Sequence, residues 1–328
     1  MGDCITILVT GATGRIGKHL VKALLDKGEK VRVLIRKTMT EFENVETFYG
    51  DLLDRKSLKK AVEDIDTVFH LAAVVDYTAP EDLMFRINVI GTRNILDVFK
   101  GDKFIYLSST AVLGKKLKDL PADENTDYNP SNLYGRTKME AEKLVKENKG
   151  IIIRSPDVLM PRFVEGYDFI FSKLLEGEMS IIGDGKNFID YIHISDLIQA
   201  LLLAKDKGRR GEIYLVSGKG VKTQKQCLEL ACKYLNVEAP KKHKTALSAK
   251  VFSRGSVIKS KIKGKTPEFI PEYVEKMLRN RTFDITKAKN ELSFEPKIDL
   301  ETSIKEMVED YLERLEEEQE EISEEQSE

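Results

Sequence analysis

The sequence predicts an α/β fold, a doubly wound parallel sheet with a smaller C-terminal lobe. Strand-like and helix-like segments alternate over roughly the first 110 residues, as repeated βα units do. A glycine-rich turn follows the first strand-like segment. A continuous apolar run over residues 67–73 is typical of a strand that is buried on both faces of a parallel sheet.

Each element follows from its local pattern. β-rich runs predict strands, apolar residues at helical spacing predict helices, and Gly28 and Gly150 each end a helix before a strand. The expected strands are residues 5–10, 30–35, 45–49, 67–73, 103–107, 151–154 and 212–216. The expected helices are residues 16–27, a helix after Asp54, and residues 85–99, 134–148 and 300–315.

The pattern changes to shorter elements beyond Pro161, which predicts a second lobe. We expect residues 1–160 to form a nucleotide-binding domain, to which residues 187–217 return. Residues 161–186 and 218–312 would form a substrate-binding lobe. The acidic residues 313–328 are expected to be a disordered tail, because their composition cannot support a packed core.

Composition excludes several classes of protein. With 41% apolar residues the chain can build a core, and a formal net charge of −2 gives no reason to expect a nucleic-acid partner. Cys4, Cys227 and Cys232 have no Cys/His cluster around them, so we expect no disulfide framework, no metal site and a reducing, cytoplasmic setting. No apolar run approaches the ~18 residues of a membrane span, and no signal peptide is expected.

The near-neutral total conceals two local imbalances. Residues 313–328 hold nine Glu and one Arg, a charge of −8, so residues 1–312 carry −2 − (−8) = +6. Residues 240–266 hold eight Lys and one Arg without an acid. A basic run of this kind is usually a solvated face, but it could also meet an anionic substrate, a membrane surface or the acidic tail.

The turn Thr10-Gly11-Ala12-Thr13-Gly14-Arg15-Ile16-Gly17 follows a strand and opens a helix. Gly11 allows a tight turn, Gly14 allows the backbone to approach a pyrophosphate, and Gly17 allows close packing of helix and strand. The alternative is an ordinary strand-to-helix turn. Its place at the first βα junction favours a dinucleotide site.

The end of the second strand distinguishes between cofactors. An acid there would hold the ribose hydroxyl of NAD, but Arg36 and Lys37 follow the strand and no acid comes before Glu41. Arg36, with Arg15 or Lys37, can pair with the 2′-phosphate of NADP. The sequence therefore favours NADP(H) and leaves NAD(H) possible, with solvated loop cations as the alternative explanation.

A candidate proton relay lies further along the chain. Tyr134 and Lys138 share one helical face at a spacing of i and i+4, and a nearby ammonium lowers the pKa of a phenol towards the useful range. Taken alone, such a pair is often an exposed accident of composition. The hydroxyls of Ser108, Ser109 and Thr110 follow a strand at the sheet edge where ligands bind, and one of them can hold a substrate oxygen.

These motifs together resemble the extended short-chain dehydrogenase/reductase family. This Rossmann-type family includes nucleotide-sugar epimerases and dehydratases, dihydroflavonol reductases and 3β-hydroxysteroid dehydrogenases. The resemblance runs from the glycine turn to about Tyr311. It rests also on residues 50–52, 70–73, 88–92, 182–185, 190–196 and 284–288 with Pro296, the last set resembling the family's C-terminal lobe.

The resemblance implies roles for individual residues. Alignment on residues 111–114 makes Ser109 the catalytic hydroxyl, with Thr110 as second choice, beside Tyr134 and Lys138. His70 is expected to be a packed residue at the end of a strand. The implied cofactor contacts are Gly11, Thr13, Gly14, Arg15, Ile16, Gly17, Arg36, Asp51, Leu52, Leu71, Ala72, Ala73, Tyr134, Lys138 and Ser155.

The substrate is less well defined. Nucleotide-sugar members often carry an Arg before the Asp-Tyr-Ile-His run, where it binds a phosphate, but Ile189 stands at this position. The family's Arg-Pro motif is also changed to Arg154-Ser155-Pro156, and the loop at residues 74–77 is rather apolar. This favours a small-molecule alcohol/ketone oxidoreductase of the dihydroflavonol-reductase or hydroxysteroid-dehydrogenase type.

Two other functions stay open at this point. One is an epimerase or dehydratase that retains NAD(P), and the other is a non-catalytic dinucleotide sensor on the same fold. The family also suggests a homodimer packed through the helices at residues 85–99 and 134–148, although the apolar faces of these helices could equally be buried within one chain.

Overall fold

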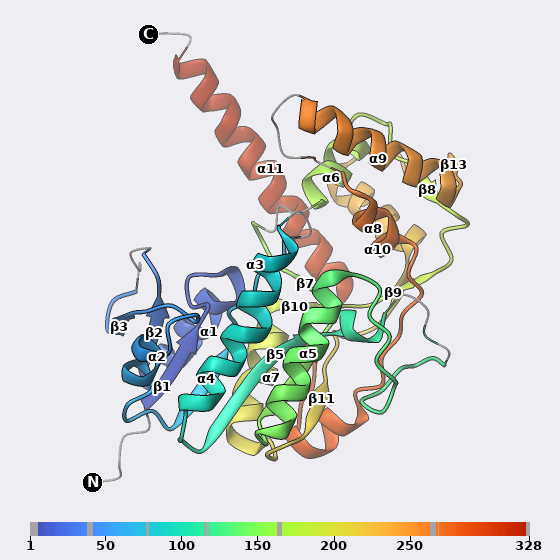
Figure 1. Ribbon diagram of the computed structural model, residues 1–328. Coiled ribbons are helices and arrows are strands. Elements are labelled where there is room, and N and C mark those ends of the chain that lie inside the picture. Colours follow the sequence, from blue (N-terminus) through green and yellow to red (C-terminus); the bar gives the residue numbers. More distant parts are fainter. Residues whose placement is uncertain are drawn as a thin grey trace. The chain divides into compact units, whose positions relative to one another are not determined.

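The computed structural model describes residues 6–37, 42–76, 79–114, 117, 119–162, 166–262, 267 and 269–325 (Figure 1). Cys4, Ile5, Glu41, Tyr77 and Lys265, which entered the predictions above, lie outside the described residues. The chain divides into two units. The first comprises residues 1–157, 194–217 and 283–296, and the second comprises residues 158–193, 218–282 and 297–328.

The first unit is built on a seven-stranded parallel sheet, which confirms the predicted fold class. The strand order β11-β6-β5-β4-β1-β2-β3 reverses between β1 and β4, and in such a sheet ligands bind beyond the carboxyl ends of the strands at this reversal. The strands are β1 (Thr6–Thr10), β2 (Lys30–Ile35), β3 (Glu46–Tyr49), β4 (Thr67–His70), β5 (Lys103–Ser109), β6 (Ile151–Ser155) and β11 (Ile213–Leu215).

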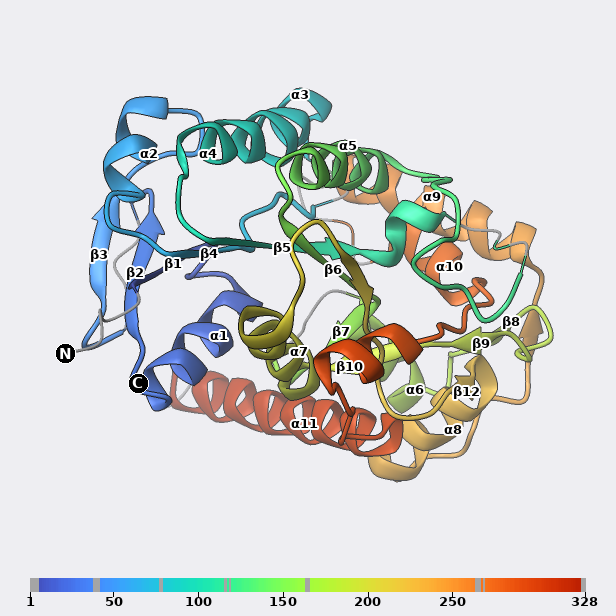
Figure 2. The same cartoon turned by 90° about the horizontal axis from the view of Figure 1, so that it is seen from below.

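Helices cover both faces of this sheet. Figure 2 shows α1 (Arg15–Asp26) and α7 (Ile194–Lys207) on one face, and α2 (Arg55–Ala61), α4 (Thr92–Val98) and α5 (Leu133–Glu147) on the other. The remaining elements are α3 (Glu81–Phe85), the π-helical segments η1 (Arg86–Gly91) and η3 (Ala288–Leu292), and the 3-10 helix η2 (Thr110–Leu113). The central strands are buried along their length, so apolar burial on both faces holds the sheet.

β4 ends earlier than the apolar run predicted. Its last residue, His70, is paired in register with Thr10, the last residue of β1. Because β1 gives way to the glycine turn after Thr10, residues 71–73 have no strand to continue pairing with on that side. They leave the sheet as a half-buried loop.

The second unit combines short strand pairs with helices around its own core. β7 (Asp157–Leu159), whose first residue belongs to the first unit, pairs with β10 (Tyr191–His193), β9 (Phe188–Ile189) with β12 (Lys222–Thr223), and β8 (Ile181–Ile182) with β13 (His243–Lys244). The helices are α6 (Tyr167–Leu175), α8 (Gln224–Leu235), α9 (Ala246–Ile262), α10 (Pro271–Met277) and α11 (Leu300–Glu325). Side chains from α6, α8 and α11 form the main apolar cluster.

The structure differs from the expected division in three places. The first unit ends at Asp157 rather than at residue 160, and the chain returns to it at Ile194 rather than at residue 187. Residues 283–296, expected in the second lobe, belong to the first unit. Polar contacts explain this last difference. Lys287 Nζ donates to Glu212 Oε2 at 2.7 Å and to Ile213 O at 2.8 Å, which ties this segment to β11.

The last helix is also longer than expected. α11 continues to Glu325, whereas the sequence predicted a helix to residue 315 followed by a disordered acidic tail. An acidic composition favours disorder, but Glu is a good helix former and the segment contains neither Gly nor Pro.

Candidate active site

The glycine turn after β1 is shaped to receive a group close to its backbone. Gly11 has φ of 72°, and a Cβ built on it would lie 2.7 Å from Ala72 N. A Cβ on Gly17 would lie 2.0 Å from Gly11 O, so no larger residue fits at either position. The turn is therefore held against the loop after β4.

The first turn of α1 fits an anion. Gly14 is the N-cap residue, no side chain caps the helix there, and no acid lies in the first turn. The backbone N–H groups at this end can therefore donate to a pyrophosphate. Thr13 and Ile16 are half-buried beside it, and Arg15 is exposed.

A second group of predicted contacts follows β2 and β3. Arg36 and Lys37 are exposed directly after β2. The Asp51 carboxylate accepts a hydrogen bond from Leu53 N at 2.8 Å, and it is Asp54, not Asp51, that caps α2. Asn94 on α4 donates to Leu52 O at 2.9 Å. Hydrogen bonds within the turn and from α4 thus fix residues 51–52. The Asp51 carboxylate is used inside this turn, and Asp54 serves as the N-cap of α2.

His70 is a packed residue, as the sequence indicated. Burial, assisted by the charge on Lys138, lowers its pKa to about 3, so the ring is neutral at physiological pH. Thr92 Oγ1 donates its proton to Asn88 O and must therefore accept from His70 Nε2 at 2.9 Å. His70 Nδ1 then accepts from Thr10 Oγ1 at 2.7 Å. The ring links the end of β1 to the first residue of α4.

Asn88 ties the loop after β4 to α5. Its carboxamide accepts from Val74 N at 2.7 Å and donates to Val74 O at 2.9 Å. It also donates to Thr137 Oγ1 at 3.0 Å, and Thr137 in turn donates to Tyr134 O at 2.9 Å. This chain of hydrogen bonds connects residues 71–74 with the backbone of Tyr134. Asn88 belongs to the segment 88–92 on which the resemblance rests, whereas no sequence signal indicates Thr137.

A backbone contact joins the helix that begins with Leu133 and Tyr134 to the 3-10 helix that follows Ser109. Ser109 ends β5, and its Oγ accepts from Ala111 N at 3.1 Å as the cap of η2. Asn132 caps α5 by accepting from Gly135 N at 2.8 Å. A Cβ on Gly135 would lie 2.6 Å from Ala111 O, so the first turn of α5 rests directly on η2. Thr110, the second choice for the catalytic hydroxyl, is buried.

Lys138 is 2% exposed, one helical turn after Tyr134. Its Nζ donates to Leu107 O at 2.6 Å and lies 4.3 Å from the centre of the Tyr106 ring. Burial lowers the pKa of the ammonium from its ordinary 10.5 to about 7, although the Glu142 carboxylate opposes this shift. The side chain can therefore change its protonation state near neutral pH.

A buried ion pair that the sequence analysis missed anchors the same helix. Glu142, two turns after Tyr134, pairs with Arg154 on β6 at 2.9 Å, and both side chains are almost fully buried. Tyr128 OH donates to Glu142 Oε2 at 2.7 Å. The i, i+4, i+8 spacing of Tyr134, Lys138 and Glu142 was the available signal.

Ser155 completes the predicted set. It is paired with Ser109 across β5 and β6, is buried, and its Oγ donates to Pro156 O at 3.0 Å. Among the described residues, no group of three or more His, Cys, Asp or Glu side chains is arranged to hold a metal ion.

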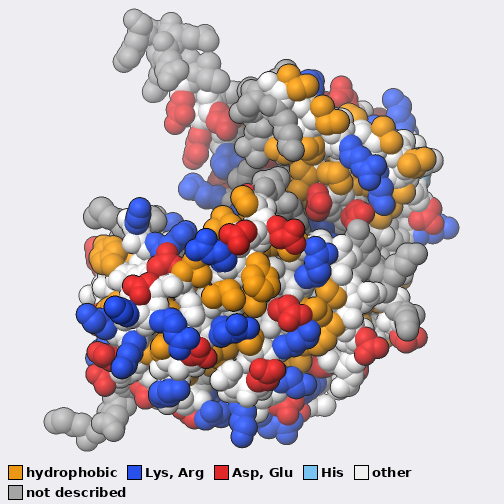
Figure 3. Space-filling model, in the orientation of Figure 1, with side chains coloured by type: hydrophobic (Ala, Val, Ile, Leu, Met, Phe, Trp, Pro, Cys, Tyr) orange, Lys and Arg blue, Asp and Glu red, His pale blue; other side chains and the backbone are white. Residues whose placement is uncertain are grey.

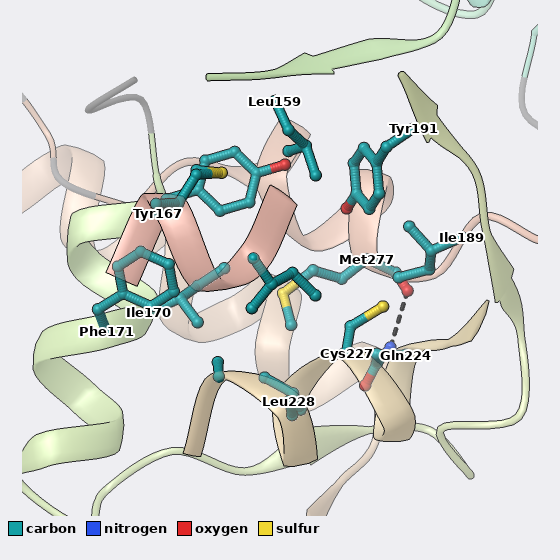
Figure 4. Close-up of a pocket in the computed structure, with 13 residues that line it drawn as sticks. Leu159, Tyr167, Ile170, Phe171, Ile189, Tyr191, Gln224, Cys227, Leu228 and Met277 are labelled. Carbon is teal, nitrogen blue, oxygen red and sulfur yellow. Dashed lines mark hydrogen bonds between the residues drawn. The ribbon is translucent and has the colours of Figure 1, made fainter. Parts of the chain in front are cut away.

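The second unit contains an apolar pocket with a cavity volume of about 60 Å³ that is partly open to solvent (Figure 4). Its walls come from β7, α6, β9, β10, α8, α10 and α11, and Ile189 is among the lining residues. Gln224 also lines the pocket, and its carboxamide accepts a hydrogen bond from Ile182 N and donates one to Met277 O. No Lys or Arg lines the pocket, so it offers nothing to pair with a diphosphate.

Comparisons with known proteins agree with this geometry. The model of the NAD dependent epimerase/dehydratase family matches residues 7–217, and that of GDP-mannose 4,6 dehydratase matches residues 166–307. The chain is 34% identical to sterol demethylase protein B of Methylococcus capsulatus, over 65% of this chain and 70% of that protein. It is 26% identical to 3-beta-hydroxysteroid dehydrogenase of Mycolicibacterium neoaurum, over 93% and 90%.

A solved structure extends the comparison to nucleotide-sugar chemistry. The UDP-glucuronic acid 4-epimerase of Bacillus cereus in complex with NAD superposes with a TM-score of 0.74 at 25% identity, covering 95% of this chain and 99% of that one. The relatives therefore act on different substrate classes.

Proposed function

This chain belongs to the NAD dependent epimerase/dehydratase family of extended short-chain dehydrogenases/reductases, and we propose that it oxidises or reduces an apolar, sterol-like substrate. It is an NAD(P)-dependent enzyme that interconverts a secondary alcohol and a ketone. The observation that carries the choice of substrate is the apolar pocket of the second unit, with Ile189 in its wall.

Bound NAD(P) supplies or accepts the hydride of this reaction. The close glycine turn and the uncapped start of α1 fit its pyrophosphate. Asp51 and Leu52 would contact the adenosine half of the cofactor. Residues 71–73 and Ser155 would contact its nicotinamide half. The exposed Arg36 supports NADP(H) as the preferred form, since a guanidinium pairs well with a 2′-phosphate.

The protein's own residues handle the substrate proton. The Ser109 hydroxyl accepts from Ala111 N, which leaves its proton to donate to the substrate oxygen. Tyr134 exchanges a proton with that oxygen. Lys138, when protonated, favours the phenolate of Tyr134, and its bond to Leu107 O fixes the end of the strand that carries Ser109.

Tyr134→Phe tests this relay. We expect cofactor binding to persist and turnover to fall at least about 100-fold, the contribution of a positioned general acid or base. Tyr49→Phe, at an exposed position on β3, is the matched control and should leave turnover unchanged. Near-normal turnover of Tyr134→Phe would overturn the proposed mechanism.

The substrate class is tested by assaying the full chain with two substrates. A 3β-hydroxysteroid with oxidised NADP or NAD should give net formation of reduced cofactor. A UDP-hexose should be neither epimerised nor dehydrated. Sugar conversion without net cofactor turnover, or a nucleotide sugar found by mass spectrometry in the purified protein, would instead establish the epimerase or dehydratase function that the Bacillus cereus relative represents.

Ile189→Arg tests the pocket separately. A guanidinium placed in an apolar pocket is poorly solvated, so we expect KM for the hydroxysteroid to rise more than tenfold with a smaller change in kcat. Phe188→Arg, at the exposed neighbouring position, is the control and should stay within about twofold. Equal changes in KM for the two variants would show that the pocket does not bind the substrate.

We also propose a cytoplasmic homodimer. The low cysteine count supports a reducing compartment. Exposed Leu83 and Phe85 on α3 support an apolar contact with a second copy, whereas Ile95, Ala141 and Val145 on α4 and α5 are buried within the chain. Sedimentation equilibrium of the wild type and of Leu83→Ser with Phe85→Ser measures this association, and a monomeric wild type would refute it.

A further inference from the structure

Helix α9 carries exposed hydrophobic side chains that the proposed reaction does not use. Leu247, Val251, Ile258 and Ile262 are 73%, 61%, 61% and 82% exposed. Their spacing of i, i+4, i+11 and i+15 places them on one face of the helix. We call these four residues the apolar stripe. Exposed apolar patches of this kind mark interaction sites.

The opposite face of α9 packs on the protein through small residues. Ala249 is buried in a cluster with Phe269, Val274 and Met277, and Ser253 is also buried. A surface helix ordinarily turns its large apolar residues inward, and α9 does the reverse. A Cβ built on Gly255, on the same face as the stripe, would meet no heavy atom within 4 Å. The described part of the chain therefore leaves this face open.

Basic side chains accompany the stripe. Lys244, Arg254 and Lys259 are exposed, and residues 240–266 contain no acid. The positive charge of Lys250 is offset by the Glu275 carboxylate on α10, 3.4 Å away, so Lys250 does not add to the basic surface. Figure 3 shows hydrophobic side chains in orange and Lys or Arg side chains in blue together over the region where Figure 1 draws α9.

We propose that α9 binds the surface of an anionic phospholipid bilayer. Interfacial helices combine an apolar face with Lys and Arg residues that contact lipid headgroups. The stripe would enter the boundary between headgroups and acyl chains, and Lys244, Arg254 and Lys259 would pair with lipid phosphates. A second copy of α9 is a poorer occupant, because it would bring two acid-free basic segments together.

The binding is peripheral rather than membrane-spanning. None of the helices in the described ranges is long and apolar enough to cross a bilayer. Peripheral binding needs only the exposed face of α9, which the protein already presents.

Sedimentation of the full chain with phosphatidylcholine vesicles, prepared with and without phosphatidylglycerol, tests the proposal. We expect binding to the anionic vesicles that weakens as salt is added, and at least tenfold weaker binding to pure phosphatidylcholine. Leu247→Ser with Ile258→Ser should lower the partition coefficient more than tenfold, and so should Arg254→Gln with Lys259→Gln. Gly255→Leu, which extends the stripe, should raise it.

Matched controls separate the stripe from general surface effects. Val221→Ser replaces an exposed apolar residue outside α9, and Lys59→Gln removes an exposed charge from α2. Both should keep wild-type binding within about twofold. Circular dichroism of every variant checks that the fold is retained.

Two results would overturn the proposal. The first is a wild type that does not bind anionic vesicles at low salt, or whose binding survives Leu247→Ser with Ile258→Ser. The second is self-association without vesicles that this double variant abolishes, which would assign the stripe to a contact between copies. Neither readout depends on enzyme activity, so the proposed function can fail or hold independently.

Discussion

The burial of the Lys138 ammonium destabilises the folded protein near neutral pH. The unfolded chain carries this lysine as a solvated ammonium with a pKa near 10.5, but burial lowers the pKa in the folded protein to about 7. Between these two values the unfolded chain binds more protons than the folded one. Stability therefore falls as pH decreases from about 10.5 to about 7, and is constant below that range with respect to this group.

Lys138→Met should reveal this cost. We expect the variant to lose turnover and to be more stable than the wild type at pH 7.5, with an advantage that shrinks by about 1.4 kcal/mol for each pH unit of increase towards 10.5. Urea denaturation across this range measures the difference. A difference that does not change with pH would mean that Lys138 titrates normally.

Arg36 decides the proposed preference for NADP(H). Arg36→Asp should weaken NADP(H) binding and strengthen NAD(H) binding, because an acid repels the 2′-phosphate and can hold the ribose 2′-hydroxyl. Titration of both cofactors followed by protein fluorescence measures the ratio of the two dissociation constants. Lys56→Asp, at an exposed site on α2, is the control. An unchanged ratio would refute the assignment.

The candidate catalytic residues were easier to predict from the sequence than the residues that position them. Tyr134 and Lys138 could be proposed because their side-chain types and spacing suit proton transfer, whereas the family resemblance selected Ser109 among three neighbouring hydroxyls. The catalytic roles of all three residues remain predictions. The link from Asn88 through Thr137 to Tyr134 could not be foreseen, because it joins residues 49 positions apart through ordinary polar side chains. The contact of Gly135 with Ala111 depends on where α5 lies relative to η2, and no local sequence pattern defines that placement.

At the scale of elements, α5 is tied to the rest of the first unit at three points. Its first turn rests on η2 at Gly135, Lys138 bonds to β5, and Glu142 pairs with Arg154 on β6. Three successive turns are therefore each tied to a different part of the unit. This fixes the helix that carries Tyr134 relative to β5.

Glu142→Gln should release one of these ties. The substitution leaves the Arg154 guanidinium buried without its partner charge, so we expect a loss of about 3–5 kcal/mol in the free energy of unfolding. Glu140→Gln breaks an exposed pair with Lys143 on the same helix and should cost no more than about 0.5 kcal/mol. Equal losses, measured by urea denaturation, would show that the buried pair does not anchor α5.

The order and type of the elements in the sheet followed from periodicity, while several of their ends did not. β4 stops at His70 because its neighbour β1 stops at Thr10, which the apolar run alone cannot indicate. The π-helical segment η1 was also not foreseen. Gly91 lies there against Leu52, where a Cβ would approach Leu52 Cβ to 2.9 Å, so packing rather than local propensity shapes the helix.

At the scale of the whole molecule, the small net charge is a cancellation between +6 on residues 1–312 and −8 on residues 313–328. The acidic residues 316–321 are exposed and continue α11 rather than forming a separate module. Tyr311 is buried in the cluster of the second unit, and Leu315 packs against it. Structural support should therefore end near Leu315.

Two truncations test where that support ends. A chain that ends at Leu315 should keep the wild-type thermal midpoint and turnover, because residues 316–321 are exposed. A chain that ends at Asp310 loses Tyr311 and the Arg314–Asp168 ion pair, and its free energy of unfolding should fall by about 3 kcal/mol or more. A large loss in the longer truncated chain would contradict this boundary.

The division into units could be anticipated only in outline. A change in pattern near Pro161 indicated a second lobe, but the assignment of residues 283–296 depends on Lys287 and on Glu291, which accepts from Tyr214 OH at 2.9 Å. These contacts join residues that are far apart in the sequence, so no local periodicity indicates them.

The path of the chain has a consequence for how this protein can acquire new substrates. The chain passes between the units at residues 157/158, 193/194, 217/218, 282/283 and 296/297, and the pocket residues come from three separate segments of the second unit. The proposed cofactor contacts, in contrast, all lie within the continuous segment 1–157. Recombination of gene fragments would therefore divide the pocket but could keep the cofactor site whole. The pocket walls nevertheless belong to one unit with its own core. Diversification is thus expected to proceed by single substitutions around the pocket, while the parts that handle the cofactor stay the same.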